Sequence, residues 1–222
     1  MTTEPTLCLN KALDPKDLEH PDLAQWLPTV DEFFKKDSPQ HRYRRWEYSL
    51  ALEAYARWFA SRADRRTAPL RLLDVGGAGS PFWRMLVKPP IVVDPQIGCS
   101  IAEYLEHDGR SAHAVFCISV IEHVEDLETF LYHLACVVAP GGLLVLTFDA
   151  CGCAGVHDAG DPHHYNWMRQ QSFTQQHTRQ VLNTLVVQHH FTLLGLFNPH
   201  WFGEVIHDYS FRSLVLVKRR VR

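Results

Sequence analysis

The chain has 222 residues, of which 46% are hydrophobic and 21% charged, a balance typical of a globular protein with one sizeable domain. Its formal net charge of -3 argues against nucleic acid or an anionic membrane as a general partner. Apolar runs of about 18 residues, which would predict a membrane span, are missing, and residues 1–5 lack the pattern of a signal peptide. We therefore expect a cytoplasmic protein with reduced cysteines and no membrane partner.

The N-terminal part of the sequence predicts an arm followed by a long helix. Residues 1–40 combine prolines and aspartates with short apolar islands, which indicates an arm or cap with one or two short helices. From His41 to Ala63, apolar residues recur at the helical period without glycine or proline. The basic, aromatic start of this helix, residues 42–48, could lie over a ligand pocket, contact nucleic acid, or only present arginines to solvent. We divide the chain into an arm at 1–40 and a main domain at 41–222.

Between residues 70 and 150, short apolar runs alternate with helical patterns. This alternation argues for a parallel sheet with helices on both faces. A helix that opens at Ser80-Pro81 must be short, because Lys88-Pro89-Pro90 stops it. Residues 140–142, Pro-Gly-Gly, predict a turn. The strands are expected at 71–75, 91–93, 114–119 and 143–148, and a second helix at 124–138.

The C-terminal part has a different pattern. Residues 173–186 predict a helix, and residues 191–197 and 209–217 predict two strands. A loop near Pro199 joins these strands, which suggests an antiparallel pair at the edge of the sheet.

The most informative pattern is an apolar strand that runs through Asp74 into a turn of small residues, 76–80, followed by a second strand that ends at Asp94, 20 residues later. Small residues allow backbone amides to approach a ligand, and a helix beginning near Ser80 would point its positive end at the same place. Asp74 could accept hydrogen bonds from a ligand ammonium group, and Asp94 could bind both hydroxyls of a ribose. The pattern predicts a nucleotide-type site at the carboxyl edge of the sheet.

A third segment extends this pattern into a family resemblance. Residues 114–118 lead into Ser-Val-Ile-Glu-His-Val at 119–124, and Pro-Gly-Gly-Leu-Leu-Val-Leu-Thr follows at 140–147. With these segments, residues 70–150 and the terminal strand pair resemble the class I S-adenosylmethionine-dependent methyltransferases, in particular the broad group with Ser-Val-Ile-Glu-His-Val after the fourth strand. The resemblance implies an α/β fold with a Rossmann-like doubly wound sheet, mostly parallel with an antiparallel C-terminal strand pair, plus an N-terminal helical arm.

The same resemblance implies a cofactor, S-adenosyl-L-methionine, and the residues that bind it. The residues along the methionine end would be Asp74, Gly76, Gly77 and Ala78; those at the ribose and adenine, Asp94 and Pro95; and those near the sulfur, Ser119 and Val120. The chain departs from the family where Ala78 and Ser80 replace turn glycines, and where only about 20 residues separate Asp94 from Ala114. Residues 101–105 in this short interval predict a shortened strand or a helical turn, and Asp108 is a candidate acid for the adenine side.

Methyl transfer needs little from the protein beyond alignment of the acceptor, because the sulfonium already activates the methyl group. Two places offer candidates for a general base or for a wall of the acceptor site. The loop after the fourth main strand contains His163, His164 and Tyr165, and His123 follows the strand expected to line the cofactor. A structural role is the alternative for each. We expect no metal, since Cys151-Gly152-Cys153 lacks the usual zinc-ligand spacing.

The sequence thus predicts a methyltransferase that acts on a small-molecule, glycan or metabolite acceptor, on oxygen. Two alternatives stay open: methylation of protein or RNA, and a methyltransferase-like binding or scaffold protein without catalytic activity. The acceptor, the methylated atom and the oligomeric state are not determined by the sequence.

Overall fold

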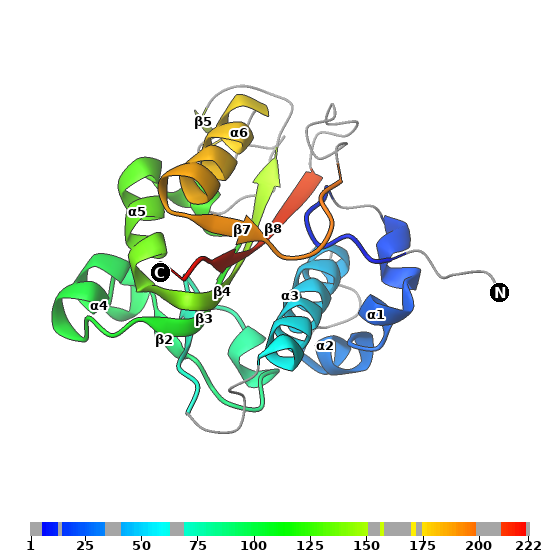
Figure 1. Ribbon diagram of the computed structural model, residues 1–222. Helices are drawn as coiled ribbons and strands as arrows, with labels where there is room; N and C mark the ends of the chain where they lie inside the picture. Colours follow the sequence, from blue (N-terminus) through cyan, green and yellow to red (C-terminus); the bar gives the residue numbers. More distant parts are fainter. Residues whose placement is uncertain are drawn as a thin grey trace.

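Among the described residues, six strands form one sheet at the centre of the molecule (Figure 1). The structure is a computed structural model that describes residues 6–12, 15–33, 41–62, 69–150, 156–157, 170–171, 175–198 and 210–220. In spatial order the strands are β2 (Ile91–Val93), β1 (Leu72–Val75), β3 (Ala112–Ile118), β4 (Val138–Ala150), β8 (Ser210–Lys218) and β7 (Phe191–Leu193). The first four are parallel, and β8 is antiparallel to both β4 and β7. This arrangement confirms the predicted mostly parallel sheet with an antiparallel C-terminal pair.

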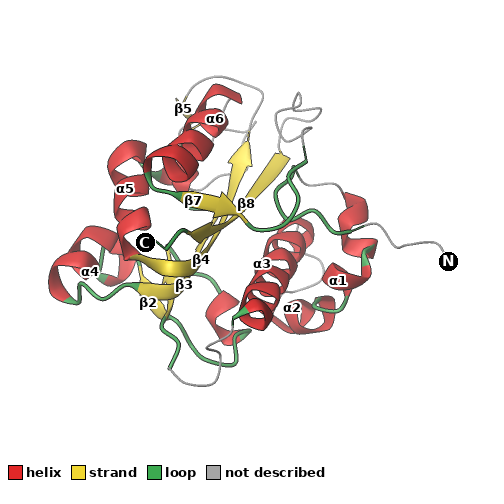
Figure 2. Cartoon of the chain, in the orientation of Figure 1, coloured by secondary structure: helices red, strands yellow, loops and turns green. Residues whose placement is uncertain are grey.

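Helices cover both faces of the sheet (Figure 2). One face carries α3 (His41–Ser61), with η1 (Pro15–Glu19), α1 (Pro21–Ala24) and α2 (Leu27–Phe33) outside it. The other face carries α4 (Ile101–His107), α5 (Leu127–Val137) and α6 (Gln175–Asn183), which continues into the π-helical turn η5 (Thr184–Gln188). Within the described ranges, no helix has the length and apolar character needed to cross a membrane.

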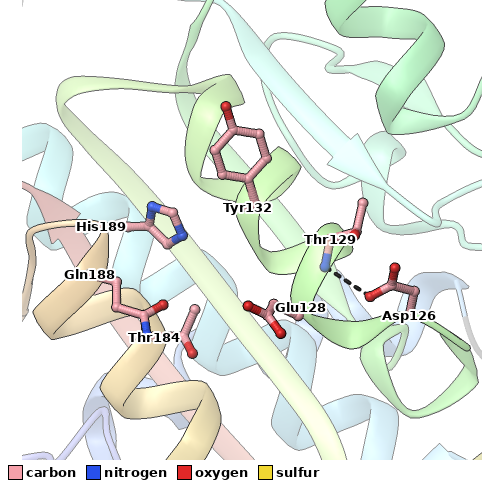
Figure 3. Close-up of a pocket in the computed structure, with 7 residues that line it drawn as sticks. All are labelled: Asp126, Glu128, Thr129, Tyr132, Thr184, Gln188 and His189. Atoms are coloured by element: carbon pink, nitrogen blue, oxygen red, sulfur yellow. Dashed lines mark hydrogen bonds between the residues drawn. The ribbon is translucent and has the colours of Figure 1, made fainter.

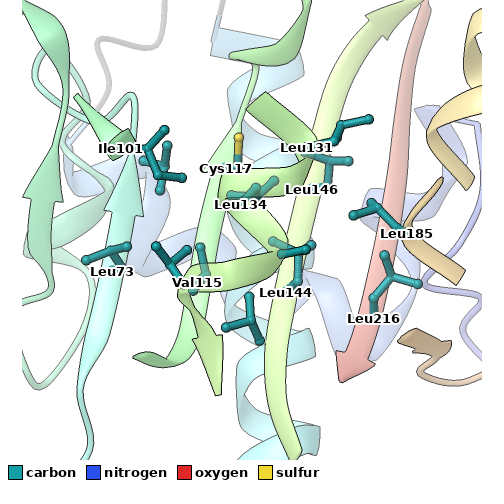
Figure 4. Close-up of a cluster of buried hydrophobic side chains, with 14 of the residues drawn as sticks. Leu73, Ile101, Val115, Cys117, Leu131, Leu134, Leu144, Leu146, Leu185 and Leu216 are labelled. Carbon is teal, nitrogen blue, oxygen red and sulfur yellow. The ribbon is translucent and has the colours of Figure 1, made fainter. Parts of the chain in front are cut away.

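Alternation along the strands explains why both faces are covered. In β1, Leu72 packs on the α3 side while its neighbour Leu73 packs on the α5 side, and in β3 Phe116 and Cys117 divide in the same way. Successive strand residues point to opposite faces, so a continuous apolar strand needs an apolar layer on each side. Figure 4 shows the cluster on the α5 side, where Leu134 of α5 and Leu185 of η5 lie over the strands.

The N-terminal segment is hydrogen-bonded to the edge of the sheet formed by β7 and β8. Asn10 donates to the carbonyl oxygen of Leu194 at 2.9 Å and accepts from the backbone N–H of Val215 at 2.7 Å. Leu9, Leu23 and other arm residues belong to the same apolar cluster as α3. The expected short helices are present in the arm, and its division from the main domain stays a prediction.

Three local predictions are wrong. Residues 140–142 do not form a separate turn, because β4 already begins at Val138, and a register shift against β3 places Gly141 inside the strand with φ +77°. The helix after Ser80 is only the 3-10 turn η2 (Phe82–Arg84), which is too short for a helix dipole to contribute. The predicted strand at 191–197 ends at Leu193.

The short interval after Asp94 contains no sheet strand in the structure. It holds the 3-10 turn η3 (Pro95–Ile97) and α4, which a capping box between Ser100 and Glu103 starts. The helical alternative for 101–105 is therefore correct, and residues 119–124 follow the third strand of this chain, as expected. Asp108 is wrong as an adenine-side acid: it ends α4 at the amino edge of the sheet and pairs with Arg71.

Candidate active site

The turn after β1 lies at the carboxyl edge of the sheet and is held close to the end of β3. The N–H of Gly76 donates to the carbonyl oxygen of Val93 at 2.8 Å, which joins the turn to β2. Gly76 has φ +78°, and a Cβ atom there would lie 2.4 Å from Cγ2 of Val120. A Cβ on Gly77 would lie 2.3 Å from Oδ2 of Asp74. Both glycines are therefore required by the packing, and the predicted residues Gly76, Gly77 and Val120 meet in one place.

The two carboxylates predicted from the sequence also lie at this turn. Asp94 is 5% exposed, and its oxygens accept from the N–H of Ala78 at 3.1 Å and of Gln96 at 2.8 Å. Asp74 is 2% exposed, and its Oδ2 has no hydrogen-bond partner among the described residues. Burial, and then the nearby charge of Asp94, raise the pKa of Asp74 to about 7. The amide of Ala78 thus holds Asp94, and Pro95 lies exposed beside it.

The end of β3 forms a second turn at the same edge. Ser119 has φ +52°, a left-handed conformation that is uncommon for a residue other than glycine. Its N–H donates to the carbonyl oxygen of Thr147 at 3.0 Å, and its Oγ donates to Oε1 of Glu47 at 2.6 Å. Ser119 and Val120 therefore lie beside the β1 turn, as the family resemblance implies for residues near the cofactor.

Helix α3 contributes two side chains from the segment 42–48, which the sequence analysis considered as a cover for a ligand pocket without selecting Glu47 or Tyr48. Glu47 is fully buried and accepts from the hydroxyls of Ser119 and Thr147, each at 2.6 Å. Tyr48 lies next to it, with its hydroxyl 2.9 Å from Oγ of Ser80, and burial raises the pKa of Tyr48 to about 12. The sequence shows an acid at position 47 among apolar and aromatic residues of α3. Its hydrogen-bond partners could not be predicted without knowing which strands α3 covers.

The turn η4 (Ile121–His123) adds a buried acid. Glu122 is fully buried, and within the described part of the chain neither of its carboxylate oxygens has a hydrogen-bond partner. Burial, and then the charge of Asp149 at the end of β4, raise the pKa of Glu122 well above its usual range. His123 is partly exposed in the same turn.

The other candidate catalytic residues, His163, His164 and Tyr165, lie outside the described residues. The two short strands on either side of that segment, β5 (Val156–His157) and β6 (Gln170–Gln171), pair with each other, and β6 packs against η4. Strand β6 thus lies against the turn that contains His123. Cys151 and Cys153 also lie outside the described residues, and within those residues no group of three or more potential ligands could hold a metal.

A separate cavity of about 400 Å³ lies between α5 and η5 (Figure 3). Asp126, Glu128, Thr129 and Tyr132 face Thr184, Gln188 and His189 across it. Among the described residues, none of those predicted for the cofactor or for catalysis lines this cavity.

Residues 56–146 match a family model described as "Methyltransferase domain". A short segment is similar to the human protein "Ubiquinone biosynthesis O-methyltransferase, mitochondrial", with 45% identity over 49 residues, 22% of this chain and 13% of that protein. The chain therefore spans only a small part of this curated relative.

Several solved structures show distant similarity to the whole chain. The [4+2]-cyclase SpnF is 14% identical with a TM-score of 0.46, covering 96% of this chain and 99% of that one. The N-methyltransferase NodS from Bradyrhizobium japonicum is 15% identical with a TM-score of 0.45, covering 89% and 97%. Magnesium protoporphyrin IX methyltransferase from Synechocystis is 16% identical with a TM-score of 0.44, covering 94% and 99%. These likenesses are too distant to assign a substrate.

The family match begins near the end of α3, ends within β4, and includes Asp74, Asp94 and both turns described above. This match supports a methyltransferase domain over residues 56–146. It agrees with the predicted resemblance to the class I S-adenosylmethionine-dependent methyltransferases, a class whose cofactor is S-adenosylmethionine.

The residues present fit that cofactor. The buried Oδ2 of Asp74 requires a hydrogen-bond donor, and an ammonium group supplies one. Each oxygen of Asp94 accepts one backbone N–H and keeps a second lone pair for a hydroxyl donor. The two glycines allow the β1 turn to pack directly against Val120 and against the carboxylate of Asp74.

Proposed function

We propose that this chain transfers the methyl group of S-adenosylmethionine to an oxygen atom of a small-molecule, glycan or metabolite acceptor. The observation that carries the proposal is the meeting of Asp74, Asp94 and two obligatory glycines at one turn, inside a segment that matches the methyltransferase family. A likeness in one segment to an O-methyltransferase supports oxygen as the target. The near-neutral charge of the chain supports a small acceptor over a nucleic acid.

When it is bound, S-adenosylmethionine supplies a methyl group that its sulfonium activates. Asp74 would accept hydrogen bonds from the ammonium group of the methionine end, and Asp94 would accept from the ribose hydroxyls with its remaining lone pairs. Ser119 and Val120 would line the cofactor near the sulfur. These residues bind and orient, which is the main contribution that this chemistry needs from a protein.

The acceptor hydroxyl must lose its proton during the transfer. We propose that a histidine of the loop at 163–164, or His123, takes this proton, and that Tyr165 forms part of the acceptor wall. The support is positional: β6, which follows residues 163–165 in the sequence, packs against η4, the turn that contains His123. A histidine is suited to the role because its ordinary pKa lies close to neutrality.

Two measurements test the proposal. Calorimetry with S-adenosylmethionine should show binding of one molecule per chain, and a panel of hydroxyl-bearing metabolites and glycans should then show release of S-adenosylhomocysteine with at least one of them. Binding without turnover on any acceptor class would favour the scaffold alternative. Turnover only with a protein or RNA would favour the second enzymatic alternative, and no binding at millimolar cofactor would reject the proposal.

A further inference from the structure

A single buried carboxylate of α3 connects the ends of two neighbouring strands. Oε1 of Glu47 accepts from the hydroxyls of Ser119, just after β3, and Thr147, in β4, at 2.6 Å each. Its Oε2 accepts from Nη1 of Arg44 at 2.9 Å. Glu47 is fully buried, so these contacts are protected from competition with water. The carboxylate therefore connects three elements at the edge of the sheet where the cofactor residues lie.

Ser119 needs such a connection because of its backbone conformation. Its φ of +52° places a residue with a Cβ atom in the left-handed region, which persists only where surrounding contacts hold it. Two contacts do so: its N–H donates to the carbonyl oxygen of Thr147, and its hydroxyl donates to Glu47. The bond to Thr147 joins Ser119 to the neighbouring strand β4, whereas the bond to Glu47 depends on the position of α3.

The same helix also contacts the other turn of the site. The hydroxyl of Tyr48 lies 2.9 Å from Oγ of Ser80, at the end of the β1 turn. The two turns themselves are in close contact where Gly76 faces Val120. Neighbouring residues of α3 thus hold both turns between which the cofactor would bind.

We infer that Glu47 is a positioning residue for the cofactor: it keeps Ser119 in its left-handed conformation, so that Ser119 and Val120 present the correct surface to the cofactor. This inference rests on the proposed function. The charge of Glu47 matters because a carboxylate can accept from two hydroxyls and a guanidinium together. A glutamine amide would turn a donor toward either Arg44 or the hydroxyls.

The test compares Glu47→Ala and Glu47→Gln with a matched variant of the same helix, Glu53→Gln. Glu53 is also a largely buried acid of α3, but it accepts from Trp26 and pairs with Arg57, which ties α3 to the arm. Calorimetry with S-adenosylhomocysteine measures affinity, and hydrogen exchange of the amides at 119–122 in the ligand-free protein measures how firmly the turn is held. We expect at least tenfold weaker binding and faster exchange in both Glu47 variants, and changes within twofold in Glu53→Gln.

A second-site variant separates positioning from general support of the fold. Glycine adopts positive φ without steric cost, so Ser119→Gly combined with Glu47→Ala should recover at least threefold of the lost affinity, whereas Ser119→Ala should recover none. Wild-type affinity in both Glu47 variants, equal losses in Glu53→Gln, or failure of the glycine to rescue would each overturn the inference. If Glu47→Ala does not fold, Glu47→Gln and Ser119→Ala still test it. Failure of the wild-type protein to bind would count against the proposed function, while the exchange rates would still test the role of Glu47.

Discussion

Replacing Asp94 with alanine removes the acceptor of two backbone N–H groups as well as the carboxylate expected to bind the ribose. The N–H groups of Ala78 and Gln96 now donate to Asp94 at 3.1 and 2.8 Å, in a site where Asp94 is 5% exposed. Leaving a buried donor without a partner costs about 1–3 kcal/mol. Because water can reach part of the emptied site, we expect the free energy of unfolding to fall by about 2–4 kcal/mol in total.

The same substitution should weaken the binding of S-adenosylmethionine by about 1–3 kcal/mol, a loss of roughly 5- to 150-fold in affinity. Calorimetry measures the affinity, and chemical denaturation measures the stability. A matched control is Asp126→Ala, which removes a carboxylate that also caps a helix, through the N–H of Thr129 at 3.0 Å. It should lower the free energy of unfolding by less than Asp94→Ala does and leave affinity unchanged. Unchanged affinity in Asp94→Ala would refute the ribose assignment.

Three further predictions concern Asp74, the β1 turn and the candidate bases. Because the pKa of Asp74 is raised to about 7 and its ionised form suits an ammonium group, calorimetry should show affinity for S-adenosylmethionine rising with pH through about 7. The free energy of unfolding of the ligand-free protein should fall between about pH 4 and pH 7, because the folded state holds the proton of Asp74 over a range in which the unfolded chain has lost it. The variant Asp74→Asn should show neither trend. Gly76→Ala should destabilise the protein by more than Gly98→Ala in thermal unfolding, because both have a φ near +80° but only Gly76 has a side chain within 4 Å of its added Cβ; equal losses would contradict the geometry. Alanine at both histidines of 163–164 should lower kcat by roughly 10²- to 10⁴-fold with cofactor affinity preserved, and an unaltered kcat would exclude them as bases.

Local patterns in the sequence were sufficient for the framework of the fold and for bringing Asp74, the glycine turn and Asp94 to one edge of the sheet. The strand at 91–93 is confirmed residue for residue, and the first strand and the long helix of α3 are confirmed to within two residues. Such patterns are reliable because apolar runs, helical periods and turns of small residues act over a few neighbouring positions. The 20-residue spacing of Asp74 and Asp94 was informative for the same reason: Asp74 lies near the end of β1 and Asp94 directly follows β2, and adjacent parallel strands bring their carboxyl ends together.

Only the tertiary structure could show which distant residues meet. The role of Glu47 depends on the packing of α3 across β3 and β4, which brings together positions 72 and 100 residues apart. Asp108 was misplaced because the sequence did not show in which direction α4 runs. The helix ends at the amino edge of the sheet, and Asp108 follows its last residue. Short-range patterns specify the elements and their turns, whereas contacts between elements follow from strand order and helix packing, which no local pattern contains.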